Sequence, residues 1–445
     1  EYSAVIIDEA HRLEDAAANH LGIHVNSGGI RYFLKKLFDP DKGRGLLMTG
    51  GEDAMELRQI VADCIDASEL FFQNVSLFLD EKNRDEFRIR SPFFVQDTLS
   101  ALLAKLEGRM KEFLEKMTDE NLMQEFIAQI QVCNHYRMSI FDYLNLAFDQ
   151  HVYWVERDNS ENRRTVSLAS APLNVAEILI EILFHGEMPV TLTSATLSIR
   201  KTLDYYYSRT GFCSGKGLIL DTPFDYEKQV TLFVPDKMPL PEEEAYLPAL
   251  CENIKFYIEM THGKAFVLFT NYAHLKHCAR ELKNFFLLKE INLLVQGEGV
   301  SNTLLLNQFR EDIDSVIFGT TSFWMGVDVP GESLSNVIIT RLPFSVPDEP
   351  LTQARCEKID AEGGNSFNNY SIPEAVLKFK QGIGRLIRRK TDRGIIVVLD
   401  RRIKTKYYGK AFLESIPKCG VPKSFSLPPK RNNKKTNDNN NEIPF

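Results

Sequence analysis

Two adjacent carboxylates stand where a strand ends near the start of the chain. Residues 2–7 form an apolar, strand-like run, and Asp8, Glu9, Ala10 and His11 follow it directly. Open α/β sheets bind ligands at the carboxyl ends of their strands. In nucleoside triphosphatases an Asp at this place holds Mg²⁺, and a following Glu can polarise the attacking water. The alternative is a helix N-terminus, where acidic side chains only favour the helix dipole.

A pair of arginines near the other end of the chain could stabilise negative charge. Residues 381–388 read QGIGRLIR, which places Arg385 and Arg388 three positions apart, on one face of an expected helix just after a glycine-containing turn. Guanidinium groups so placed can reach a γ-phosphate and stabilise the charge of its transition state. Arg389, Lys390 and Arg393 nearby support the alternative of a solvated basic face.

Two further segments carry hydroxyl groups. Residues 319–328, GTTSFWMGVD, combine hydroxyls, an aromatic ring and glycines. This composition suits backbone contacts with phosphates, and it equally suits a turn around a packed Trp324. The hydroxyls of Thr193, Ser194 and Thr196 could link a nucleotide site to a nucleic-acid groove, or they could cap the next helix.

The hydrophobic pattern predicts the elements that position these groups. From about residue 28 to 156 apolar residues recur at spacings of three and four, which predicts helices that bury one face. From Val166 onward short apolar runs alternate with helical stretches, which indicates α/β units around parallel strands. Prolines between residues 222 and 248 mark the crossing between two such units. The strands expected in the second unit are 265–269, 293–296, 315–318, 336–340 and 394–399.

Composition bounds the class of protein. With 445 residues, 44% of them hydrophobic and 26% charged, the chain is ordinary globular material, which excludes collagen and bulk disorder. The net charge of −8 gives no chain-wide positive field, although residues 385–404 hold eight Lys or Arg against two Asp. The seven cysteines lack any CxxC spacing, and their closest pair in sequence is Cys251 and Cys278, which favours a reduced, cytoplasmic protein. No apolar run is long enough to span a bilayer.

Taken together and in this order, the motifs resemble the DinG branch of the DinG/XPD-like superfamily 2 DNA helicases. The resemblance covers essentially residues 1–420, and it implies an α/β fold of two RecA-like P-loop NTPase lobes, parallel sheets flanked by helices, with an all-helical arch insertion. Residues 1–30 with 166–225 would form the first lobe, 31–165 the arch and 226–420 the second lobe, followed by a disordered tail at 421–445. The motifs that carry it are DEAH at 8–11, TSATL at 193–197, the strand 265–270 with Asn271, GTTSFWMGVDVPG at 319–331 and QGIGRLIRRKTDRG at 381–394.

The resemblance also implies cofactors, a partner and residue roles. It implies ATP and Mg²⁺, single-stranded or branched DNA, and 5′-to-3′ translocation, with no membrane and no protein partner that the residues identify. Asp8 and Glu9 would serve Mg²⁺ and water activation, while Arg385 and Arg388 would be arginine fingers. The other implied roles are nucleotide binding by Gly326, Asp328 and Gln381, coupling of hydrolysis to movement by His11, Ser194 and Thr196, and coupling or DNA contacts by Thr193, Thr270, Asn271, Thr320, Ser322 and Trp324.

Two departures from the family pattern bear on activity. Met325 stands where members commonly carry Glu. No phosphate loop of the form G-x-x-x-x-G-K-[ST] occurs, because residues 211–217 have neither its spacing nor its hydroxyl. The family places this loop, and its iron–sulfur cysteines when present, before DEAH, and the chain starts at Glu1 without an initiator Met. We therefore expect an N-terminally truncated piece that is inactive by itself, with a non-catalytic nucleic-acid-binding module as the alternative.

Overall fold

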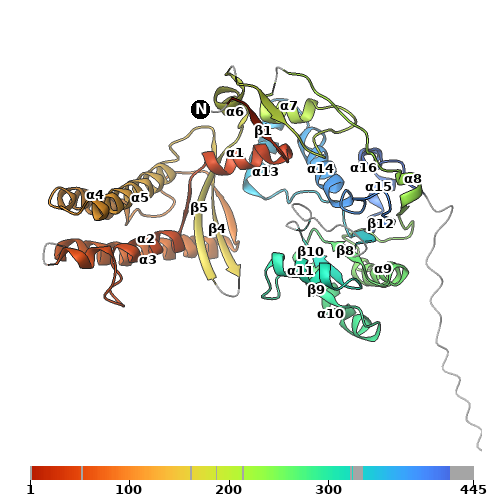
Figure 1. Cartoon of the computed structure of the whole chain (residues 1–445), viewed down its shortest axis with the longest axis horizontal. Helices are drawn as coiled ribbons and strands as arrows, with labels where there is room; N and C mark the ends of the chain where they lie inside the picture. The colour runs from red at the N-terminus through yellow and green to blue at the C-terminus, as the bar shows by residue number, and fades with distance from the viewer. Residues whose placement is uncertain are drawn as a thin grey trace, which may run out of the picture. The chain divides into compact units, whose positions relative to one another are not determined.

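The computed structural model describes residues 3–51, 54–160, 163–186, 188–212, 215–320, 323 and 334–420 (Figure 1). They belong to two compact units. Unit 1 comprises Glu1–Leu218 with Ser345–Ser371, and unit 2 comprises Ile219–Phe344 with Ile372–Phe445. Residues 345–371 thus fold with unit 1, although the chain on both sides of them belongs to unit 2. Within the described ranges, none of the helices combines the length and the apolar character that a membrane span needs.

Two sheets lie in the described part of unit 1. β1 (Val5–Ile7) pairs in parallel with β6 (Val190–Leu192), so the two strands end side by side. The other sheet is antiparallel in the order β2-β5-β4-β3. Its strands are β2 (His24–Asn26), β3 (Glu86–Ile89), β4 (His151–Ser160) and β5 (Arg163–Pro172).

The antiparallel sheet corrects the expectation of an all-helical insertion. β3 and β4 lie within residues 31–165, and β5 is antiparallel although the pattern after Val166 predicted parallel strands. Val155 and Leu168 face each other across β4 and β5, and both are fully buried. The strands β4 and β5 are ten residues long, but successive residues are buried in both, as at 152–153 and 166–172. Without alternation of apolar and polar residues, the period of two that predicts a half-buried strand is absent from the sequence.

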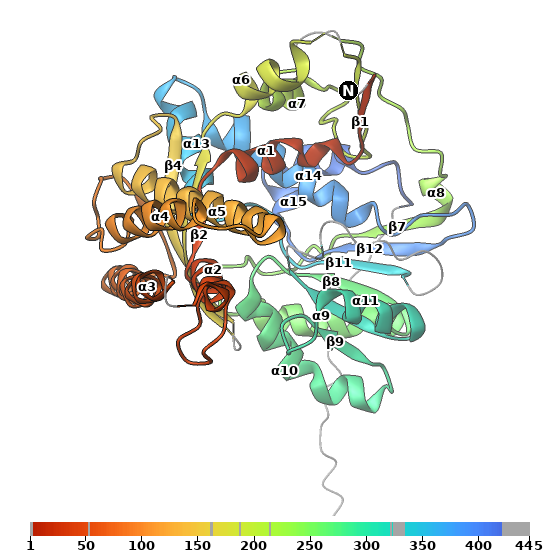
Figure 2. The same ribbon diagram turned by 60° about the vertical axis from the view of Figure 1, so that its left-hand side comes forward.

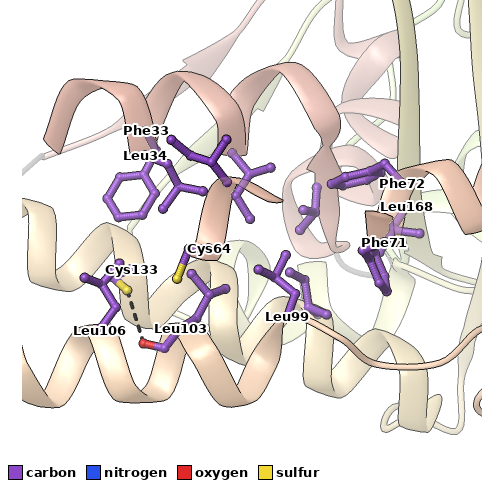
Figure 3. Close-up of a cluster of buried hydrophobic side chains, with 14 of the residues drawn as sticks. Phe33, Leu34, Cys64, Phe71, Phe72, Leu99, Leu103, Leu106, Cys133 and Leu168 are labelled. Carbon is purple, nitrogen blue, oxygen red and sulfur yellow. Dashed lines mark hydrogen bonds between the residues drawn. The ribbon is translucent and has the colours of Figure 1, made fainter. Parts of the chain in front are cut away.

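Long helices build the rest of unit 1 (Figure 1). α4 and α5 lie in the stretch from about 28 to 156 that the spacing predicted to be helical, and α2 packs along α3. Their apolar faces meet in one core, where Phe33, Cys64 and Leu103 converge from three different helices (Figure 3). The helices are α1 (Leu13–Leu21), α2 (Ser27–Leu37), α3 (Met55–Lys82), α4 (Ser100–Leu114), α5 (Glu120–Asn145), α6 (Ala176–Leu179), α7 (Asp204–Thr210) and α13 (Pro350–Ala361), with the turns η1 (Ala10–Arg12), η2 (Leu46–Gly50), η3 (Ile180–Phe184) and η4 (Phe367–Ser371).

Ion pairs hold the segment 345–371 to unit 1. Glu357 on α13 accepts hydrogen bonds from Arg88 and Arg90 at 2.7 and 2.6 Å. Arg355, also on α13, lies 2.6 Å from Glu14 of α1, and both side chains are nearly buried. A buried pair of this kind is costly to break from one side, because the remaining charge loses its partner.

Unit 2 is built on a parallel sheet of six described strands, in the order β7-β12-β11-β8-β10-β9 (Figure 2). The sequence analysis predicted five of them, and all five are confirmed within a residue or two. The strands are β7 (Val230–Phe233), β8 (Ala265–Leu268), β9 (Leu293–Val295), β10 (Val316–Gly319), β11 (Asn336–Ile339) and β12 (Gly394–Val398). The helices are α8 (Tyr226–Gln229), α9 (Tyr246–Thr261), α10 (Tyr272–Leu288), α11 (Asn302–Glu311), α14 (Ile372–Ile383), α15 (Arg402–Thr405) and α16 (Gly409–Ser415).

Helices cover both faces of this sheet. Val267 of β8 belongs to the same buried cluster as Ile254 of α9 and Leu282 of α10. Phe266, the preceding residue, faces the other way and packs on Phe309 of α11, with ring centroids 4.8 Å apart. Because neighbouring residues of a strand point to opposite faces, both must be apolar, which explains the continuous apolar runs in the sequence.

Candidate active site

The DEAH and TSATL segments meet at the carboxyl ends of β1 and β6. The backbone N–H of Thr193 donates to the carbonyl of Ile7, and the N–H of Ala10 donates to the carbonyl of Thr193, each at 2.9 Å. The Thr193 hydroxyl then donates to Oδ1 of Asp8 at 2.7 Å. Parallel pairing of two short strands is thus enough to bring side chains about 185 residues apart in sequence into contact.

A second set of contacts joins Glu9, His11 and Ser194. Nδ1 of His11 lies 2.9 Å from Oγ of Ser194 and 3.2 Å from Oε2 of Glu9. The Ser194 hydroxyl donates to Glu9 at 3.4 Å and accepts from the N–H of Thr196 at 3.2 Å. Glu9 adopts a left-handed backbone with φ 50°, which turns the chain sharply between the strand and η1. The histidine therefore touches both segments through one ring nitrogen.

Charge and burial differ within this site. The hydrogen bond from Thr193 lowers the pKa of Asp8 below its usual value, so this exposed side chain is a carboxylate at neutral pH. Burial lowers the pKa of His11, although the negative charge of Glu9 opposes the effect. His11 is therefore neutral at neutral pH and can use Nδ1 either to donate or to accept a hydrogen bond.

The donor set fits a magnesium ion that is shared with a substrate. Mg²⁺ is commonly bound by one or two carboxylates together with phosphate oxygens and water. Asp8 is exposed and ionised, as such a ligand must be. Throughout the described ranges, no group of three or more His, Cys, Asp or Glu side chains is arranged to hold a metal by itself. Asp8 is thus the residue of this site that would hold Mg²⁺, together with phosphate oxygens and water.

Unit 2 carries the other residues singled out by the sequence. Thr270 follows β8, and the Asn271 side chain caps α10 by accepting from the N–H of His274 at 3.1 Å. Thr320 follows β10, and Gln381 lies in the last turn of α14. Four predicted residues, Ser322, Trp324, Gly326 and Asp328, lie outside the described residues, as does Met325.

The structure corrects the expectation that Arg385 and Arg388 share a helical face. α14 ends at Ile383, and the carboxylate of Asp392 accepts from the backbone N–H groups of Arg388 and Arg389 at 2.9 and 2.7 Å. This local bonding draws the chain into a turn, where the helical period no longer applies. As a result Arg385 is buried, with 5% of its surface exposed, whereas Arg388 is exposed.

The sequence analysis missed Gln296 as a partner of Thr320. The side-chain oxygen of Gln296 accepts from the backbone N–H of Thr320 at 2.7 Å and from its hydroxyl at 3.0 Å. Gln296 directly follows β9, the neighbour of β10 in the sheet. The position after a predicted strand was visible in the sequence, but the adjacency of the two strands was not.

The chain is similar in sequence to a family of helicase domains and to DinG and YoaA proteins. A family model described as the helicase C-terminal domain matches residues 254–419. The chain is 31% identical to the 3'-5' exonuclease DinG of Bacillus subtilis, over 95% of this chain and 49% of that protein. It is 32% identical to the ATP-dependent DNA helicase YoaA of Escherichia coli, over 94% of this chain and 63% of that protein. The chain therefore spans about half to three-fifths of the length of these relatives.

Solved structures of XPD share the fold. An apo XPD structure matches 94% of this chain and 76% of its own chain, with a TM-score of 0.57 and 14% sequence identity. The Xpd4 structure from S. tokodaii matches 94% of this chain and 75% of its own, with a TM-score of 0.53 and 15% identity. At this level of identity the likeness concerns the fold alone.

Proposed function

The chain belongs to the DinG-like branch of the DinG/XPD helicases, and on that premise we propose that it carries the hydrolysis and translocation machinery of an ATP-dependent DNA helicase. The observation that carries the proposal is the contact between two motifs at one end of the β1–β6 sheet. Thr193 donates to Asp8 at 2.7 Å, and His11 lies 2.9 Å from Ser194. A carboxylate pair at the carboxyl ends of strands is the part of an NTPase site that holds Mg²⁺ and activates water.

In this proposal each residue has a separate task. Asp8 holds Mg²⁺, which when bound supplies positive charge to the triphosphate. Glu9 accepts a proton from, or orients, the attacking water. Arg388 is the residue of unit 2 that we assign to the charge of the transition state, because its side chain is exposed, whereas Arg385 is buried. Gln381 is assigned to nucleotide binding, together with Gly326 and Asp328.

We assign coupling to the contact between His11 and Ser194. Both side chains also contact Glu9. A movement of the Glu9 carboxylate during hydrolysis would therefore shift the Ser194 hydroxyl, and with it the segment that follows β6. Thr196, Thr270, Asn271, Thr320, Ser322 and Trp324 would pass this change to single-stranded DNA. Residues 31–165 would form the arch, and 226–420 the second lobe apart from 345–371, which fold with unit 1. Movement along DNA would run 5′ to 3′.

A non-catalytic DNA-binding module is the second candidate. It is favoured by the lack of a G-x-x-x-x-G-K-[ST] loop in the 445 residues, since the β- and γ-phosphates need that cradle of amides and its lysine. The exonuclease in the name of the B. subtilis relative is not assigned to this chain, which spans 49% of that protein.

The deciding experiment measures DNA-stimulated ATPase in the natural gene product that carries these residues. We expect turnover that single-stranded DNA raises, and a loss of about 10²-fold or more in Glu9→Gln. Glu181→Gln is the matched control, because Glu181 is an exposed glutamate of the same unit. A gene product that binds DNA but hydrolyses no ATP would establish the second candidate instead, and equal turnover in both variants would overturn the role of Glu9.

A further inference from the structure

Two cysteines that the proposed function does not use face each other inside unit 2. Cys251 lies on α9 and Cys278 on α10, on the face of the sheet that these helices cover. Their Sγ atoms are 3.6 Å apart, within a thiol–thiol hydrogen bond. A disulfide has an S–S bond of about 2.05 Å, so the sulfur atoms would need to approach by about 1.5 Å.

The two thiols are not equivalent. Cys251 keeps 6% of its surface exposed, whereas Cys278 is fully buried. The hydrogen bond between the two thiols lowers the pKa of Cys251, and this effect outweighs burial, which acts in the opposite direction. The positive charge of Lys255 also lowers this pKa, while the negative charges of Glu281 and Glu252 raise it. The pKa of Cys278 is raised by the same hydrogen bond and by burial. The thiolate is the reactive form of cysteine, so Cys251 is the sulfur that meets an oxidant first.

We propose that Cys251 and Cys278 are a redox modification site, at which a hydroperoxide converts the two thiols into an intramolecular disulfide. The Cys251 thiolate attacks one peroxide oxygen, the O–O bond breaks, and the products are a sulfenic acid and an alcohol or water. The Cys278 thiol then attacks the sulfenic sulfur, the S–S bond forms, and the hydroxyl leaves with the thiol proton as water. The two cysteines are oxidised together by two electrons, which the peroxide accepts. This inference does not depend on helicase activity.

Cys64 and Cys133 show what a purely structural pair looks like in the same protein. Both lie in the core of unit 1, and the thiol of Cys133 donates to the carbonyl of Leu103 at 3.5 Å (Figure 3). Burial raises the pKa of each to about 12, so neither forms a thiolate at neutral pH. The contrast predicts that oxidation is selective for the pair in unit 2.

The bridge would join the two helices that flank β8. The closed loop runs from residue 251 to 278 and includes the whole of β8 and Asn271, which caps α10. A cross-link of this kind restricts the unfolded chain, so unit 2 should unfold at a higher temperature once oxidised. Reduction with dithiothreitol should return the midpoint to its starting value.

The test is peptide mapping of the 445-residue chain after treatment with hydrogen peroxide. Remaining thiols are blocked with N-ethylmaleimide and the protein is digested with trypsin. We expect peptide 238–255 to be recovered joined to peptide 277–280, and two of the seven thiols to be lost per chain. Recovery of both peptides as maleimide adducts, while the half-buried Cys356 is oxidised, would overturn the proposal.

Single variants separate the two steps. With Cys278→Ala, dimedone should trap a sulfenic acid on Cys251, whereas with Cys251→Ala the Cys278 thiol should survive the same treatment. Cys356→Ser should leave the bridge unchanged. Trapping on Cys278 but not on Cys251 would refute the order of attack. If either variant fails to fold, the time course in the unmodified chain decides, because a dimedone adduct on Cys251 must precede the bridge.

Discussion

The hydroxyl of Thr193 donates to Oδ1 of Asp8 at 2.7 Å and so joins the carboxyl ends of β6 and β1. A backbone hydrogen bond on each side of this contact, from Thr193 to Ile7 and from Ala10 to Thr193, fixes the two segments to each other. The orientation of the Asp8 carboxylate is therefore set by the motif on the neighbouring strand.

Replacing Thr193 with Val should weaken the use of magnesium. Val keeps the shape of Thr but cannot donate to Asp8, so the carboxylate loses its fixed orientation. Asp8 stays ionised at neutral pH because its ordinary pKa is already far below 7, while the acid limb of the ATPase pH profile should move to higher pH. We expect the half-saturating Mg²⁺ concentration to rise about 3- to 10-fold in the natural gene product. Thr193→Ser should restore it, and a Ser variant as weak as the Val variant would contradict this role of the hydroxyl.

Replacing Ser194 with Ala should separate hydrolysis from movement. The change removes the oxygen that lies 2.9 Å from His11 and contacts Glu9, while Asp8 and Thr193 keep their bond. We expect ATPase within about 3-fold of the unmodified enzyme and strand unwinding reduced about 10-fold or more. Parallel ATPase and unwinding assays measure the ratio, and equal losses in both would argue against a coupling role.

Arg385 and Arg388 should respond differently to replacement by Ala. Arg385 is buried, so its loss leaves a cavity in unit 2 and should reduce the free energy of unfolding by about 2 kcal/mol. Arg388 is exposed, so its loss should leave the unfolding midpoint unchanged and reduce ATPase turnover about 10³-fold. Thermal unfolding and ATPase assays on both variants decide the matter. A stable Arg388→Ala enzyme with full turnover would remove it from the site.

Glu14 should be essential for the stability of unit 1. It accepts from Nε of Arg209 at 3.0 Å and lies 2.6 Å from Arg355, whose Nη1 donates to Tyr370 at 3.1 Å. Glu14→Leu would leave two nearly buried guanidinium groups without their carboxylate, which should cost about 3 kcal/mol in the free energy of unfolding. Glu69→Leu is the control, because its pair with Arg31 is exposed on both sides and should be worth less than about 1 kcal/mol. Denaturant unfolding of both variants compares the two costs.

Unit 1 should lose stability as the pH rises through about 7. Burial and the negative charges of Glu349 and Glu156 raise the pKa of Glu86 to about 7, from an ordinary value near 4.5. The folded state binds the Glu86 proton more tightly than the unfolded state does. The contribution of this proton to the free energy of unfolding is therefore complete below about pH 4.5 and is lost as the pH rises to about 7. Glu86→Gln should make the unfolding midpoint less dependent on pH between about pH 5 and 8. Glu181→Gln should leave that dependence unchanged. An unchanged slope in Glu86→Gln would exclude this cause.

Much of this protein could be anticipated from residue order alone. The parallel strands of unit 2 were predictable because a strand buried on both faces must be apolar at successive positions, as in 265–268 and 337–339. DEAH and TSATL were recognisable because each directly follows a strand-like run, and strand ends are where ligands bind. The helices α4 and α5 followed from spacings of three and four.

Tertiary structure alone decided which of these groups meet and which are buried. The bond between Thr193 and Asp8 depends on β1 pairing with β6, and no local pattern specifies that pairing. The burial of Arg385 depends on the early end of α14 and on the cap by Asp392, which overrode the helical period of the sequence. The antiparallel sheet of unit 1 and the contact between Cys251 and Cys278 also depend on packing between segments that are distant in sequence. Sequence patterns report how one segment buries its own side chains, whereas contacts between distant segments depend on packing across the whole unit.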